Sequence, residues 1–173
     1  MFTLLIGGAA SGKSELAESL IIKCGALPRY YIATMQPIDD ESRARIARHR
    51  AMREQKSFDT VECYTGLNNI KLPQKGAALL ECVSNLAANE LFCKNGAGGN
   101  TVEAVLHGVE RLLCQCKHLV AVSNEVFCGG CDYEGDTLRY MKVLAEINRR
   151  LAQIADNVAE IVCGQAVYYK VSD

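Results

Sequence analysis

The sequence predicts an α/β fold with a mostly parallel sheet flanked by helices. Short apolar runs of strand length alternate along the chain with segments of helical periodicity. In addition, the first apolar run leads directly into a glycine-rich pattern that in proteins connects a strand to a helix around a phosphate group. We find neither an internal repeat nor a linker, so residues 1–173 are expected to form one catalytic domain.

The expected elements follow one another in a regular order. Strands are expected at 2–6, 29–33, 77–81, 118–123, 158–162 and 166–170. Helices are expected at 13–24, 40–55, 83–93, 101–115 and 137–155. The helix at 40–55 is highly charged, with Ile46 almost its only apolar residue, so it should lie exposed on the surface. Acidic residues at its start suit the positive end of the helix dipole.

Composition excludes several classes of protein. The chain is 49% hydrophobic and 23% charged, which is incompatible with general disorder. Its 19 basic and 20 acidic residues give a net charge of −1, so no nucleic-acid partner is expected. No uncharged apolar run reaches the roughly 18 residues of a membrane span. The N-terminus lacks the positive region of a signal peptide, and we therefore expect a cytoplasmic protein.

The nine cysteines are expected to be reduced thiols, because their number is odd and most lie in apolar contexts. One alternative is a tetrahedral zinc site made of Cys114, Cys116, Cys128 and Cys131. A strand-like segment between the two pairs argues against it. The alternative corresponds to a nucleotide-regulated, zinc-bearing binding module rather than an enzyme.

The strongest single motif is the pattern G-x-x-x-x-G-K-S, formed by Gly7, Gly8, Ala9, Ala10, Ser11, Gly12, Lys13 and Ser14. Glycines let the backbone turn tightly, so that successive N–H groups point inward and bind a polyphosphate. Lys13 is expected to reach the β- and γ-phosphates, and the Ser14 hydroxyl to bind Mg²⁺. The motif therefore predicts binding of a nucleoside triphosphate.

Glu81 ends the expected strand at 77–81. An acidic residue at the end of an apolar strand commonly organises the Mg²⁺ ion in P-loop proteins, so we expect Glu81 to act on the metal. The alternative is a carboxylate that simply faces solvent.

His49 stands among five arginines in the segment 43–53. On a helix, Arg45, His49 and Arg53 share one face, where arginines would bind a triphosphate. Their positive charges would also lower the pKa of the imidazole and keep it neutral and nucleophilic. A solvated basic helix face is an equally good interpretation of the charges alone.

Beyond these motifs, the chain resembles a family over about residues 3–170. The run YIAT at 31–34, the acidic residues 39–41 and the spacing Arg45-Ile46-x-x-His49-Arg50-x-x-Arg53 resemble the adenosylcobinamide kinase/adenosylcobinamide-phosphate guanylyltransferase family of cobalamin synthesis. Further similarities lie in TVE at 60–62, LEC at 80–82 and SNEV at 123–126.

The resemblance implies a RecA-like P-loop NTPase fold, a homotrimer and two reactions. The first phosphorylates adenosylcobinamide with ATP or GTP. The second transfers GMP from GTP to a histidine and then to adenosylcobinamide phosphate, giving adenosylcobinamide-GDP. His49 matches the histidine, with Lys13 and Glu81 as further catalytic residues. The implied nucleotide contacts are the P-loop, Thr34, Met35, Gln36, Arg50, Ala51, Met52, Arg53, Glu62 and Glu81.

The chain also departs from the family pattern. Ala10 replaces an arginine that is common in the P-loop, and the segment at 127–132 replaces a G-x-G-I-V-P motif. The departures fall largely in the half expected to face the corrinoid. Another small-molecule P-loop kinase, in which His49 only binds phosphate, is the alternative enzyme.

Overall fold

A computed structural model describes residues 1–25, 27–53, 56–127 and 132–172. Seven strands form one sheet in the order β3-β2-β4-β5-β1-β6-β7. The strands are β1 Phe2–Gly7, β2 Arg29–Ala33, β3 Asp59–Glu62, β4 Gly76–Leu80, β5 Cys116–Asn124, β6 Asn157–Val162 and β7 Gln165–Lys170. The helices are α1 Lys13–Lys23, α2 Asp40–Arg53, α3 Val83–Phe92, α4 Thr101–Gln115 and α5 Gly135–Ile154, with short 3-10 turns at Leu67–Asn69 and Gly98–Asn100.

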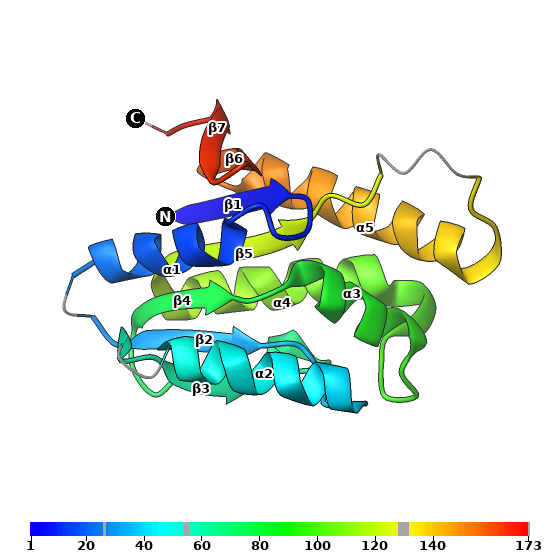
Figure 1. The fold of residues 1–173 in the computed structure, drawn as a ribbon, viewed down its shortest axis with the longest axis horizontal. Coiled ribbons are helices and arrows are strands. Elements are labelled where there is room, and N and C mark those ends of the chain that lie inside the picture. The colour runs from blue at the N-terminus through cyan, green and yellow to red at the C-terminus, as the bar shows by residue number, and fades with distance from the viewer. Residues whose placement is uncertain (26, 54–55, 128–131, 173) are drawn as a thin grey trace.

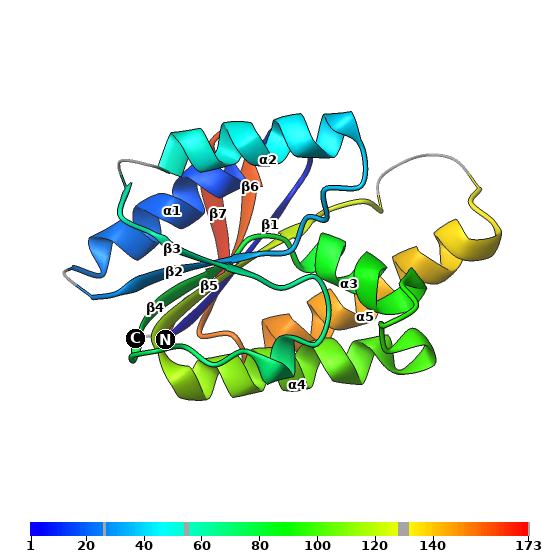
Figure 2. The same cartoon turned by 90° about the horizontal axis from the view of Figure 1, so that it is seen from below.

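All neighbouring strands are parallel except β6 and β7, which form an antiparallel hairpin. Helices cover both faces of the sheet (Figures 1 and 2). Figure 2 shows α1 and α2 on one face and α3, α4 and α5 on the other. The sheet is therefore the middle layer of three, as expected for strands joined by helical crossovers.

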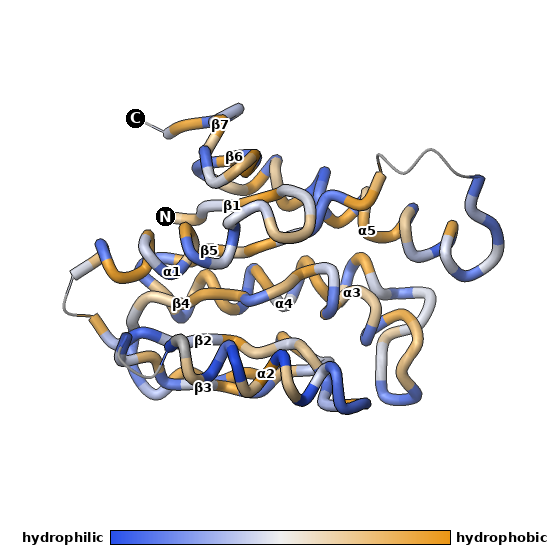
Figure 3. Tube along the Cα trace, in the orientation of Figure 1, coloured by the Kyte–Doolittle hydropathy of each residue, from blue (hydrophilic) through white to orange (hydrophobic). Residues whose placement is uncertain are grey.

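Alternating side chains of the strands supply two separate cores. Leu4 of β1 packs in a cluster with residues of α3, α4 and α5, whereas its neighbour Leu5 packs with Ala17 and Ile21 of α1. This follows from the two-residue period of a strand, which places successive side chains on opposite faces. The central strands are accordingly apolar throughout, whereas α2 carries many hydrophilic residues (Figure 3).

The helices and strands expected from the sequence are present, with ends that differ by one or two residues among the described positions. The strand β3 was not expected. Its sequence, DTVE, is polar and its side chains are mostly exposed because it forms the sheet edge, so hydrophobic patterning gives no signal for it.

The carboxyl ends of β1, β2, β4 and β5 lie at one edge of the sheet. The register pairs Gly7 at the end of β1 with Asn124 at the end of β5, and Leu80 at the end of β4 with Ile32 near the end of β2. The P-loop follows β1, and Glu81 follows β4. In open parallel sheets this edge is where ligands bind.

Candidate functional site

The P-loop occupies the connection between β1 and α1, where the pattern placed it. Gly12 has a φ of +94°, a left-handed conformation that glycine adopts without strain. Gly7 is needed for a different reason, because a β-carbon there would lie 2.6 Å from the Ile161 carbonyl oxygen. The β6–β7 turn also supports the loop: the Gly164 N–H donates to the Ser11 carbonyl oxygen over 2.9 Å. The loop is therefore positioned by close packing against β6 and by a hydrogen bond from the β6–β7 turn.

Lys13 is buried and bends back onto its own loop. Its Nζ atom donates to the carbonyl oxygens of Gly7 at 2.8 Å and Gly8 at 2.5 Å. Burial lowers the pKa of Lys13 from its usual value, and the nearby Cys82 thiol opposes this in part. The ammonium group thus lies at the loop, in the position from which it can turn toward a phosphate group.

A cavity of about 490 Å³ lies over the P-loop. Residues of the loop from Ala9 to Ser14 form one side, and Arg45 and His49 of α2 line it as well. Asn85 and Asn124 add amide side chains from the ends of neighbouring elements. The cavity, hereafter the P-loop cavity, therefore combines the phosphate-binding loop with the arginine-rich helix.

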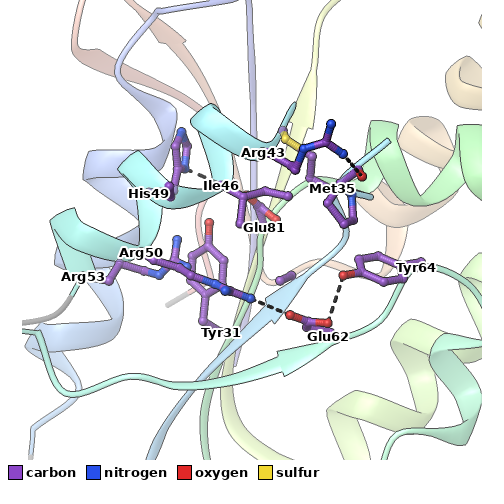
Figure 4. A pocket seen from close by; sticks show the side chains of 13 residues that line it. Tyr31, Met35, Arg43, Ile46, His49, Arg50, Arg53, Glu62, Tyr64 and Glu81 are labelled. Carbon is purple, nitrogen blue, oxygen red and sulfur yellow. Dashed lines mark hydrogen bonds and ion pairs between the residues drawn. The ribbon is translucent and has the colours of Figure 1, made fainter. Parts of the chain in front are cut away.

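A second cavity of about 590 Å³ lies beside the first, between α2 and the ends of β2 and β3 (Figure 4). Its wall includes Tyr31, Arg50, Arg53, Glu62 and Tyr64. We call it the α2 cavity. Three residues line both cavities: Met35, His49 and Glu81. The predicted nucleophile and the predicted metal-directed acid therefore lie in the wall between the two spaces.

His49 and Glu81 lie next to each other in this wall. The His49 Nδ1 atom lies 3.9 Å from the Glu81 Oε1 atom (Figure 4). The pKa of His49 is lowered, first by burial and further by Arg53 and Arg45, whereas Glu81 and Glu18 oppose the shift. The direction expected from the arginines is confirmed, although burial is the largest cause. A neutral imidazole with Nδ1 toward a carboxylate leaves Nε2 available for attack.

Glu81 lies directly after β4 and is anchored on the side away from His49. Its Oε2 atom accepts a hydrogen bond from the Thr34 backbone N–H over 3.0 Å. The Thr34 hydroxyl in turn donates to the Cys82 carbonyl oxygen over 3.0 Å. The pKa of Tyr31 is raised by burial and then by Glu81, which lies close to the phenol. Glu81 is thus held in place, with one oxygen directed toward the histidine, and does not simply face solvent.

Arg53 is a buried cation beneath the α2 cavity. Its guanidinium carbon lies 3.4 Å from the centre of the Tyr31 ring, a cation–π contact. Only 6% of Arg53 is exposed, and its Nε and Nη1 atoms have no hydrogen-bond partner among the described residues. Buried donors without partners are rare in proteins, so these two are well suited to hydrogen-bond acceptors of a bound ligand.

Glu62 lines the α2 cavity, and each of its two carboxylate oxygens accepts one hydrogen bond and keeps a second lone pair free. Arg50 donates to its Oε1 atom over 2.5 Å, and the Tyr64 hydroxyl donates to its Oε2 atom over 2.9 Å (Figure 4). The contacts fix the carboxylate next to an aromatic ring. Such an arrangement can accept hydrogen bonds from the edge of a planar base.

The remaining expected nucleotide residues lie in different places. Met35 lines both cavities. Thr34 lines neither of them but is buried against Glu81, to which its backbone N–H donates. In contrast, Gln36 donates to the Cys93 Sγ atom over 3.3 Å and, like the exposed Ala51, is not part of either cavity wall. The side chain of Met52 lies outside the described residues.

Sequence reasoning assigned no role to several residues that line the cavities. Lys56 donates to the buried Glu18 over 2.5 Å and connects the segment after α2 to α1 in the P-loop cavity. Asn124 ends β5, and this strand-end position in a parallel sheet was the available signal for it. Tyr31 lies in the middle of β2, where hydrophobic patterning indicates only a strand residue.

The zinc alternative involves positions that are only partly described. Cys114 is exposed on α4, and Cys116 is buried in β5, where burial raises its pKa to about 12. Cys128 and Cys131 lie outside the described residues. Within the described ranges, no three His, Cys, Asp or Glu side chains gather closely enough to hold a metal ion by themselves. The same ranges contain no helix that is both long and apolar enough to span a bilayer.

The fold and the loop define a RecA-like P-loop protein. An ATPase domain of known structure shares the fold with a TM-score of 0.55 and 8% sequence identity, covering 99% of this chain and 77% of that chain. Within that class, the chain belongs to the cobinamide kinase/cobinamide phosphate guanyltransferase family, whose sequence model matches residues 3–169.

Relatives of known name support the same membership. The bifunctional adenosylcobalamin biosynthesis protein CobU of Salmonella typhimurium is 34% identical, over 98% of this chain and 100% of the relative. CobU of Escherichia coli is 32% identical over the same shares. The bifunctional adenosylcobalamin biosynthesis protein CobP of Pseudomonas aeruginosa is 31% identical over 95% of this chain and 94% of the relative. The resemblance identified from the motifs is therefore confirmed.

Proposed function

We propose that this chain catalyses both reactions of its family: phosphorylation of adenosylcobinamide, and transfer of GMP from GTP to adenosylcobinamide phosphate. The observation that carries the proposal is the position of His49, which lines the P-loop cavity and the α2 cavity together with Glu81. A nucleophile between a triphosphate site and a second site can take a group from one and pass it to the other.

In the kinase step, the P-loop holds the β- and γ-phosphates of ATP or GTP, and Lys13 leaves the loop carbonyls to neutralise them. The γ-phosphoryl group passes directly to the aminopropanol hydroxyl of adenosylcobinamide. Asn85 and Asn124 line the same cavity and supply uncharged polar groups near the transferred group. This step is mainly a matter of positioning and charge neutralisation.

In the guanylyl step, Nε2 of His49 attacks the α-phosphorus of GTP and pyrophosphate leaves. The guanosine part occupies the α2 cavity, where the buried donors of Arg53 and the carboxylate of Glu62 are available to it. Arg50, which donates to Glu62, also lines this cavity and contacts the guanosine part. Adenosylcobinamide phosphate then displaces the histidine and regenerates the free imidazole.

Mg²⁺ is the cofactor that the triphosphate chemistry requires. Magnesium in such sites keeps several waters and takes only one or two protein ligands beside the phosphate oxygens. Ser14 and Glu81 both line the P-loop cavity, so these two residues fit that limited requirement. Bound Mg²⁺ would neutralise charge on the phosphates while the chain's own groups orient them.

The family resemblance also leads us to propose a homotrimer that acts in the cytoplasm. The seven cysteines in the described part of the chain are all free thiols, in keeping with a reducing compartment. Sedimentation equilibrium tests the trimer directly, since a mass of one or two chains would contradict it.

The decisive experiment is labelling with GTP that carries the label on the α-phosphorus. The parent protein should retain acid-labile GMP, and His49→Ala should retain none, while the variants of the other two histidines, His107→Ala and His118→Ala, should label normally. Phosphorylation of adenosylcobinamide should largely persist in His49→Ala because that step forms no histidine adduct. If His49→Ala is labelled as well as the parent, the assignment fails and the alternative of a plain P-loop kinase is favoured.

A further inference from the structure

The arginines of α2 divide between the two cavities. Arg43, Arg50 and Arg53 line the α2 cavity, and Arg45 lines the P-loop cavity. Arg48 lines neither and is exposed. Helical periodicity alone puts Arg45, His49 and Arg53 on one face. The tertiary structure separates the two arginines, because the Arg53 guanidinium stacks on the Tyr31 ring in the α2 cavity and Arg45 lines the P-loop cavity.

Three cations line the P-loop cavity, and two of them already have partners. Lys13 donates to the loop carbonyls, and Lys56 is paired with Glu18. Arg45 makes no hydrogen bond or ion pair with another residue of the described ranges, and its side chain is exposed to the cavity. It is therefore the cation with all of its guanidinium donors available to a polyphosphate.

We propose that Arg45 is a catalytic residue of the guanylyl step, which binds the β- and γ-phosphates of GTP and stabilises them as they leave as pyrophosphate. The proposal rests on the function proposed above and adds a residue to it. The sequence placed Arg45 on a helix face where arginines would bind a triphosphate, and the P-loop cavity assigns it to the β- and γ-phosphates in particular.

The chemistry of the step explains the need for this cation. A bond forms between Nε2 of His49 and the α-phosphorus of GTP. The bond from that phosphorus to the bridging oxygen of the β-phosphate breaks, and its electron pair stays on the oxygen. The proton on Nδ1 stays on the imidazole ring, which becomes a cation that the nearby Glu81 carboxylate stabilises. The departing pyrophosphate thus gains negative charge inside the P-loop cavity, where a guanidinium group stabilises it more than it stabilises bound GTP.

The position on the helix suits this role. Arg45 lies one turn before His49, so the two side chains are neighbours on the same rigid element. The helix therefore places the guanidinium group on the P-loop side of the nucleophile, within the cavity that the leaving group occupies, where a positive charge is effective in catalysis.

The test compares Arg45→Gln with Arg48→Gln, an exposed arginine on the same helix that lines no cavity. In single-turnover labelling from GTP with a labelled α-phosphorus, Arg45→Gln should form the GMP adduct at least about 100-fold more slowly than the parent. Arg48→Gln should label at the parental rate. Equal slowing in both variants would indicate a general effect of helix charge and would overturn the proposal.

Binding of inorganic pyrophosphate to the unlabelled protein gives a second readout that does not depend on GMP transfer. By calorimetry, Arg45→Gln should bind pyrophosphate about tenfold more weakly than the parent, the loss expected for one charged contact. Unchanged affinity overturns the proposal, whether or not the parent labels. Weakened binding in a protein whose parent form does not label would overturn the proposed function and the catalytic role of Arg45 with it, leaving Arg45 as a polyphosphate contact only.

Discussion

The Nδ1 atom of His49 lies 3.9 Å from Oε1 of Glu81, and the other oxygen of the same carboxylate accepts the Thr34 backbone N–H at 3.0 Å. Glu81 is therefore a link between the end of β2, where Thr34 is fixed, and the helix that carries the histidine. A carboxylate held in this way can orient an imidazole and stabilise its positive charge, a role in addition to the action on Mg²⁺ expected from its place at a strand end.

Replacing Glu81 by Gln should leave GTP binding measurable and lower both reactions by about 100-fold or more, through the loss of a negative charge near the metal and the histidine. Steady-state rates at a series of Mg²⁺ concentrations test this. If the rate and the Mg²⁺ dependence both equal those of the parent, Glu81 is only a carboxylate at a strand end.

Replacing Lys13 by Ala should weaken GTP binding by about 10- to 100-fold and abolish both reactions, because the ammonium group is the cation within the loop itself. Equilibrium dialysis and the two activity assays measure this. Lys23→Ala, at the exposed end of the same helix, is the matched control and should behave as the parent. Near-normal GTP turnover in Lys13→Ala would contradict the idea that both reactions share the P-loop.

As the pH is lowered, the rate of GMP labelling should begin to decline only below the ordinary histidine pKa of about 6.5. The pKa of His49 is lowered by burial and by Arg53 and Arg45, with Glu81 and Glu18 opposing, so the net shift places it below the ordinary value of about 6.5. The imidazole therefore remains neutral as the pH falls through 6.5, and the rate should decline only below that. A pH profile of single-turnover labelling, with His107→Ala as the control, measures it. A decline centred at or above 6.5 would show that the pKa is not lowered.

The two glycines at the start of the P-loop should respond differently to alanine. The added β-carbon of Gly7→Ala would lie 2.6 Å from the Ile161 carbonyl oxygen, whereas that of Gly8→Ala meets no atom within 4 Å. We expect Gly7→Ala to destabilise the protein by about 2 kcal/mol, which lowers Tm by roughly 4–8 °C in a chain of this size. Gly8→Ala should unfold at the parental temperature. Thermal unfolding monitored by circular dichroism tests both, and equal Tm values for the two variants would refute the steric account.

The sequence was informative wherever a function needs a fixed local pattern. The P-loop requires glycines, a lysine and a serine at set spacing, and the structure places it between β1 and α1 as expected. His49 stood out because it is a histidine among arginines, and Glu81 because it follows an apolar strand. Strands and helices with a clear hydrophobic period were also found, while the polar edge strand β3 was missed because an edge needs no buried face.

What the sequence determined by itself is therefore the fold class and the phosphate loop, and it also singled out the side chains that we propose to be reactive. Only the tertiary structure decided how these side chains are shared between two cavities: it stacked Arg53 on the Tyr31 ring, placed Arg45 in the P-loop cavity, and placed His49 and Glu81 in the common wall. The physical reason is the distance along the sequence over which each property is decided. Backbone turns and side-chain periodicity depend on neighbours within a few residues, whereas burial, cavities and pKa shifts depend on which distant strands the sheet brings together.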